Sequence, residues 1–271
     1  MTEEKTNFFV NSYNILNIAY TENMCLKYIN ELLMKFTSQN LLDLEAFLWV
    51  KNEWGEIEKR SFILIQKYCS IFRYIPWLLF VWVGNSIAMN AAHKESDIDI
   101  FVITKSHALW FVRIIMTLIL ALTGMRKTYK KHAWKICLSF FCTEDALDFR
   151  DIAIEKDIYL YYRILTMKPI LIKGDIYKRF IEENSWVDFS EFQNIYTHHS
   201  AYLSYDLKEG WGGNTYIKYI DSILKKMLLS RSIKKYEALG QPEGVIINDN
   251  MLKFHNTDKR KYIRENVLEK I

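Results

Sequence analysis

Two short apolar segments joined by a turn are the most constraining feature of this sequence. The first, LLFVWV, runs from Leu78 to Val83, and the second, residues 97–103, opens with Asp97 and Asp99. Each has the length and residue types of a buried strand. We therefore expect two neighbouring strands here and place the other elements around them.

The two aspartates of the second segment are expected to lie on one face. Side chains alternate along a strand, so Asp97 and Asp99 project together while Ile98 projects from the opposite side. Two such carboxylates repel each other unless a hard cation lies between them, and Mg²⁺ is the usual one. The pair predicts a site for Mg²⁺ or Mn²⁺, and a solvated strand end is the simpler alternative.

The turn after the first strand supplies a second feature. Gly84, Asn85 and Ser86 form a small-residue turn that leads into a short helical segment. Such a turn leaves backbone N–H groups free to bind a phosphate. A phosphate site beside a metal site suits a nucleoside triphosphate (NTP) with its Mg²⁺.

This combination resembles the nucleotidyltransferase superfamily related to DNA polymerase β. Its signature is a Gly-Ser or Gly-Gly turn, a short helix and Asp-x-Asp on the next strand, matched here by residues 85–88 and 96–99. Asn85 and Asn90 stand where the family often has glycine, and asparagine is the residue that best tolerates a positive φ after glycine. Residues 168–187 and 251–255 are similar to a bacterial subgroup of minimal members, and the resemblance covers roughly residues 60–271.

The resemblance implies transfer of a nucleoside monophosphate from Mg-NTP to an acceptor hydroxyl on a small molecule, a protein or RNA. Asp97 and Asp99 would be the catalytic and metal-binding residues. The nucleotide would contact Gly84, Asn85 and Ser86. A basic, aromatic-containing stretch at 126–135 would add Lys135, although a solvated loop is the simpler interpretation of that stretch.

One expected residue is missing. The family usually has a third carboxylate on the next core strand, which we place at residues 134–142, and this segment contains no acid. Its candidate positions on one face hold Lys135, Cys137 and Ser139, and the first acids beyond it are Glu144 and Asp145. A catalytically degenerate protein that binds nucleotide or a protein partner is therefore the alternative function.

The remaining pattern predicts an α/β (α+β) fold with a small mixed sheet. Helical periodicity covers residues 7–52, 56–72, 108–125, 154–167, 176–183 and 215–239, and a short strand is expected at 169–172. We expect a helical N-terminal region at 1–75, a nucleotidyltransferase core at 76–187 and a helical C-terminal region at 188–271. The long basic helix at 215–239 either lies solvated on the protein or closes over the nucleotide.

Composition adds weaker constraints. The net charge of +4 over 271 residues is compatible with a polyanionic ligand but does not require one. The four cysteines form no Cys-x-x-Cys pair, so reduced thiols and a cytoplasmic location are expected. The apolar run at 108–125 is near the lower length limit for a membrane span and contains Arg113. We expect a buried helix and no integral membrane span, with peripheral membrane contact as the alternative.

Overall fold

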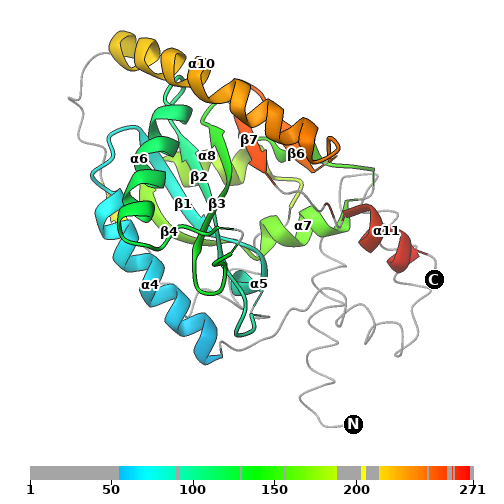
Figure 1. Cartoon of the computed structure of the whole chain (residues 1–271). Helices are drawn as coiled ribbons and strands as arrows, with labels where there is room; N and C mark the ends of the chain where they lie inside the picture. Colours follow the sequence, from blue (N-terminus) through cyan, green and yellow to red (C-terminus); the bar gives the residue numbers. More distant parts are fainter. Residues whose placement is uncertain are drawn as a thin grey trace, which may run out of the picture.

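One mixed sheet forms the centre of the molecule. The computed structural model describes residues 55–89, 92–128, 130–155, 157–187, 203–205, 214–242, 244–254, 258 and 260–268. Within them, seven strands pair in the order β5-β4-β1-β2-β3-β7-β6 (Figure 1). The strands are β1 (Leu78–Val83), β2 (Ile98–Thr104), β3 (Ile136–Thr143), β4 (Lys168–Lys173), β5 (Leu203–Tyr205), β6 (Val245–Ile247) and β7 (Met251–Phe254). The predicted α/β (α+β) class is confirmed.

Helices cover the sheet on two sides. They are α4 (Glu56–Phe72), α5 (Asn85–Ala88), α6 (Leu109–Leu122), α7 (Ile158–Leu165), α8 (Ile176–Glu183), α10 (Asn214–Ala238), α11 (Arg260–Leu268) and a short 3₁₀ helix, η1 (Phe149–Ile152). The side covered by α4, α6 and α10 is called the first face here, and the side covered by η1, α7, α8 and α11 is the second face.

The strand directions bring several strand ends to one edge of the sheet. Strand β1 is antiparallel to both β2 and β4, whereas β2 is parallel to β3. The end of β1 therefore lies beside the starts of β2, β3 and β4. We call this edge the site edge, because the predicted carboxylates and the predicted turn are both located there.

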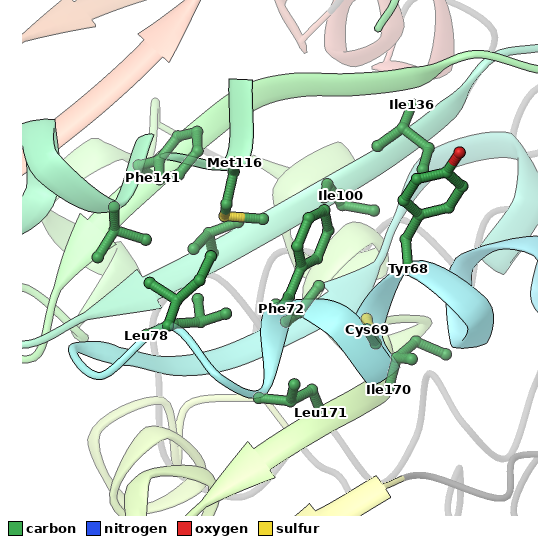
Figure 2. Packing of buried hydrophobic residues seen from close by; sticks show 14 of the residues in the cluster. Tyr68, Cys69, Phe72, Leu78, Ile100, Met116, Ile136, Phe141, Ile170 and Leu171 are labelled. Carbon is green, nitrogen blue, oxygen red and sulfur yellow. The ribbon is translucent and has the colours of Figure 1, made fainter. Parts of the chain in front are cut away.

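The first face is packed by aliphatic side chains of the strands against α4 and α6. Tyr68, Cys69 and Phe72 of α4 and Met116 of α6 meet side chains from the central strands (Figure 2). The labelled strand residues in that view are Leu78, Ile100, Ile136, Phe141, Ile170 and Leu171. Alternation along β2 places Ile98, Ile100 and Val102 on this face.

The second face is packed mainly by aromatic rings. Phe101 of β2 stacks on Trp82 at a centroid distance of 5.4 Å and meets Phe140 of β3 edge-on at 4.8 Å. Phe149 of η1 and Phe180 of α8 complete the cluster, with 5.4 Å between their centroids. Since Phe101 lies on this face, Asp99, two residues earlier, projects from the same side.

Most predicted elements of the core agree with the observed ones. Strand 78–83 and helices 56–72 and 176–183 have the predicted bounds, and the other core strands and α6 shift by one to three residues. The predicted helix at 7–52 lies outside the described residues.

The prediction for residues 188–271 needs correction. This region was expected to be helical, but it contributes β5, β6 and β7 to the sheet in addition to α10 and α11. These strands have only three or four residues, which is too short for an alternating pattern to be recognised. The sheet therefore extends beyond the predicted core boundary at residue 187.

A buried lysine provides a test of the packing. Lys173 of β4 is 6% exposed, its Nζ donates a hydrogen bond to the Ile75 carbonyl at 2.7 Å, and burial lowers its pKa to about 8. The unfolded lysine has a pKa of about 10.4, so between these values the unfolded chain binds more protons and stability rises with pH. In Lys173→Met we expect this rise to be smaller by on the order of 2 kcal/mol. Lys168 and Lys253, whose pKa values burial also lowers, supply the remainder.

Urea unfolding at a series of pH values from 7.5 to 10 measures this effect. The matched control is Lys178→Met, because Lys178 has a side chain that is 78% exposed and should leave the pH dependence unchanged. An equal rise with pH in wild type and Lys173→Met would contradict the assignment.

Candidate metal and nucleotide site

The two predicted carboxylates meet a thiol at the site edge. Asp97 directly precedes β2 and Asp99 is the second residue of that strand, where it pairs across the sheet with Cys137 of β3. The potential ligand atoms of the three side chains all lie within 4.8 Å of one another, and each side chain is half-buried. The prediction that Asp97 and Asp99 share one side is consistent with this geometry.

Backbone hydrogen bonds hold Asp97 in place although it lies just outside the strand. The Ser96 carbonyl accepts from the Trp134 N–H at 2.9 Å, and the Ile98 N–H donates to the Lys135 carbonyl at 2.8 Å. Both neighbours of Asp97 are therefore attached to the segment that leads into β3. This attachment fixes the carboxylate relative to Cys137.

A lysine ammonium contacts one of the two carboxylates. Lys127 Nζ lies 2.5 Å from Asp97 Oδ2, and the Lys127 N–H donates to the Ile136 carbonyl at 3.0 Å. The pKa of Asp97 is raised by burial and by Asp99, while Lys127 acts in the opposite direction. Burial lowers the pKa of Lys127, but the nearby Cys137, Asp97 and Asp99 outweigh it, so this pKa is raised overall. The ammonium thus neutralises part of the paired negative charge.

The turn after β1 is bonded directly to Asp99. The Gly84 N–H donates to the Asp99 carbonyl at 3.0 Å, and the Asn85 amide Nδ2 donates to Asp99 Oδ2 at 2.5 Å. Asn85 has φ of 57°, which agrees with the expectation that asparagine replaces glycine at a positive-φ position. The turn therefore orients one of the two carboxylates.

Gly84 is required by close packing and not by its backbone angle. Its φ of −121° is available to any residue, but a Cβ at this position would lie 2.5 Å from a ring carbon of Phe101. A side chain here would push the ring that packs beneath the site. The glycine therefore allows β1 to reach the turn at the level of Asp99.

Sequence reasoning did not identify Arg163 of α7, which reaches the turn from the second face. Its guanidinium donates a hydrogen bond to Asn85 Oδ1 and lies 4.9 Å from the ring centroid of Tyr159 and 5.9 Å from that of Phe101. The contact joins residues 78 positions apart, so no local pattern reveals it. Arg163 fixes the amide orientation that Asp99 requires.

Ser86 and Lys135 have different surroundings from each other. Ser86 is half-buried in α5, and its hydroxyl makes no hydrogen bond to any residue that the structure describes. The Nζ of Lys135 instead donates to the Gly124 carbonyl at 2.9 Å, just past the end of α6. Of the predicted basic stretch, it is Lys127 that the fold places at the carboxylates.

Neither Glu144 nor Asp145, the first acids beyond the predicted strand, supplies the missing third carboxylate. Strands β2 and β3 are parallel, and these acids follow the far end of β3, roughly 20 Å along the strand from Cys137. Glu144 pairs with Lys105 at 3.3 Å and with Arg179 at 3.1 Å, and Asp145 accepts from Ser106. The position beside Asp99 on β3 is held by Cys137.

The long basic helix lies on the other face from the Asp99 side chain. Helix α10 packs against α6 on the first face, where Asp221 Oδ1 accepts from the Phe111 N–H at 2.7 Å. This position does not support the expectation that it closes over the nucleotide. Asn90, the other predicted glycine replacement, lies outside the described residues.

Comparisons with protein-family models, with curated proteins and with solved structures find no match. In the described part of the chain, no helix combines the length and apolar character needed to cross a bilayer. The interpretation of the site therefore rests on its own geometry and chemistry.

The donor set fits one divalent cation. Two carboxylates and a thiol converge at a separation compatible with shared coordination, and an ammonium ion stands beside them as a counter-charge. Asp97, Asp99 and Cys137 are the residues that would hold the ion. Lys127 would have to move away from Asp97 for the ion to enter.

Competition by Lys127 is testable. In Lys127→Met we expect the affinity for Mn²⁺ without nucleotide to rise several-fold, because the ammonium no longer occupies Asp97. Electron paramagnetic resonance of free Mn²⁺ measures the affinity. Lys130→Met is the matched control, since Lys130 is exposed in the same loop. Equal affinities in all three proteins would contradict this role.

The Asn85 bridge is tested by two substitutions. Asn85→Gly keeps the positive φ and Asn85→Ala does not, so the alanine variant should be less stable by about 1 kcal/mol in urea unfolding. Both variants lose the bonds to Asp99 and Arg163 and should bind Mn²⁺ equally weakly. Wild-type Mn²⁺ affinity in Asn85→Gly would show that the bridge does not orient Asp99.

Proposed function

We propose that this protein transfers a nucleoside monophosphate from a metal-bound NTP to an acceptor hydroxyl. The observation that carries the proposal is the adjacency, on one sheet edge, of Asp97 and Asp99 with the turn at 84–86. The sequence resemblance to nucleotidyltransferases related to DNA polymerase β supports the same assignment.

In this proposal each residue of the site edge has a defined task. Asp97 and Asp99 would hold a divalent cation, which when bound would supply positive charge to stabilise the phosphate oxygens and the leaving pyrophosphate. Asn85, fixed by Arg163, keeps the Asp99 carboxylate turned toward the cation. The Ser86 hydroxyl and the neighbouring N–H groups bind the phosphate oxygens.

Lys127 has two successive partners in the proposed reaction. Without ligand it pairs with Asp97. With Asp97 committed to a cation, the Lys127 ammonium would be available to donate to a phosphate oxygen. The flexible lysine stem permits this short movement. The same group thereby prevents carboxylate repulsion in the free protein and adds positive charge to the loaded site.

Slow turnover is expected, because the part of the chain that the structure describes places no additional carboxylate at the site to accept the proton of the attacking hydroxyl. Among the described residues, the corresponding position on β3 holds Cys137. This observation favours a second candidate function, in which the site binds a nucleotide without transferring it. We place either function in the cytoplasm, where thiols such as Cys69, Cys137 and Cys142 remain reduced.

A labelling assay tests the transferase function. The purified protein is incubated with each α-labelled NTP, with Mg²⁺, Mn²⁺ or Zn²⁺, and with cell extract as the source of acceptor. We expect labelled product from wild type and a loss of at least about 100-fold in Asp97→Asn and in Asp99→Asn, as for removal of a group that stabilises the transition state. The exposed Asp175→Asn is the matched control and should retain full activity.

The outcome that opposes transfer is equally specific. If wild type binds Mg-ATP and the aspartate variants do not, yet no aspartate-dependent label forms with any NTP, the binding function replaces the transferase function. Label that forms equally in the aspartate variants would place the chemistry elsewhere.

A further inference from the structure

We infer that the Cys137 thiolate is the third ligand of the cation held by Asp97 and Asp99, and that this cation belongs to the class of Zn²⁺ and not to that of Mg²⁺. The inference deepens the proposed function, on whose carboxylate pair it rests, because it assigns the ion at that pair. It concerns metal binding, so it can be tested in the absence of nucleotide.

The strand pairing directs Cys137 at the carboxylates. Its register partner is Asp99, and two residues later on β2 the pairing has shifted, so that Phe101 opposes Phe140. Two residues of β2 thus match three of β3, which defines a bulge directly after Cys137. Bulges re-aim side chains near functional sites, and here the bulge leaves the thiol beside Asp99 while Phe140 returns to the aromatic cluster.

The three donor atoms suit a single ion. All lie within 4.8 Å of one another, and two ligands of one ion are separated by up to about twice the ligand distance of 2.0–2.3 Å. A small inward movement of the side chains therefore lets one cation contact both carboxylates and the sulfur. Lys127 leaves Asp97 in the same step, so an ammonium is exchanged for a dication.

Donor chemistry selects the class of ion. Mg²⁺ prefers a near-octahedral shell of oxygen ligands, whereas Zn²⁺ accepts sulfur, nitrogen and oxygen in tetrahedral sites. Three protein ligands leave the fourth Zn²⁺ position open, which is the arrangement of catalytic zinc sites. A phosphate oxygen of the nucleotide would occupy that position. Binding converts the thiol to a thiolate and releases its proton to solvent, so charge and atoms balance.

Cd²⁺ is a direct probe, because Cd²⁺–thiolate bonds absorb in the ultraviolet. Without nucleotide, we expect a saturable absorption equivalent to one ion per chain in wild type, its absence in Cys137→Ser, and at least tenfold weaker binding in the double variant Asp97→Asn/Asp99→Asn. Cys69→Ala is the matched control and should keep the absorption, because Cys69 is 0% exposed in the first-face core. Zn²⁺ should remove the absorption at concentrations at least 100-fold lower than Mg²⁺.

Either of two results would overturn the inference. One is an absorption that persists in Cys137→Ser, and the other is displacement of Cd²⁺ by Mg²⁺ as effectively as by Zn²⁺. Cys137→Asp guards against misfolding of the serine variant, because it should lose the absorption but gain Mg²⁺ affinity, and a gain of affinity requires a folded site. Unchanged Mg²⁺ affinity in Cys137→Asp would also oppose the assignment.

The two proposals fail in different experiments. Cd²⁺ binding through Cys137 without any labelled transfer would retain the metal assignment and remove the transferase function. Aspartate-dependent labelling in a protein that shows no thiolate absorption would do the reverse.

Discussion

The antiparallel pairing of β1 with β2 is the constraint on which the site depends. The hydrogen bond from the Gly84 N–H to the Asp99 carbonyl extends this pairing past the end of β1, so the turn begins at the level of the carboxylate. The parallel pairing of β2 with β3 then adds Cys137 at the same level. A shift by one residue in either pairing would turn Asp99 or Cys137 to the other face. Register, more than any individual side chain, therefore assembles the site.

Electrostatics determines which side chains surround the two aspartates. Two half-buried carboxylates so close together are unfavourable unless positive charge or hydrogen bonds compensate for them. Lys127 compensates for Asp97, and the Asn85 amide compensates for Asp99, while Arg163 holds the amide from α7. The free protein therefore contains the positive charge that a cation would bring. This explains how the fold tolerates the pair before any ligand binds.

Much of this arrangement could be predicted from the sequence, because it follows from local periodicity. Alternation predicted that Asp97 and Asp99 share one side, and turn chemistry predicted the positive φ of Asn85. The choice of Lys127 in place of Lys135 could not be predicted, since it depends on how the loop after α6 attaches to β3. Arg163 was equally inaccessible, because its contact with Asn85 requires α7 to be placed on the second face. Tertiary packing brings these residues to the site, and that packing cannot be deduced from the local sequence pattern.

The hydrogen bonds that join Arg163, Asn85 and Asp99 also bear on whether the site has lost its ligand. Ordering an arginine side chain costs up to about 2 kcal/mol of conformational entropy, and polar networks in protein interiors are often less stabilising than apolar packing of similar volume. A fold that had lost its ligand would gain more stability from an apolar residue in place of Asp99. The chain instead holds this carboxylate by a side-chain hydrogen bond and leaves the Ser86 hydroxyl without a partner in the described part of the structure. A carboxylate held in one orientation is what the proposed ligand binding requires.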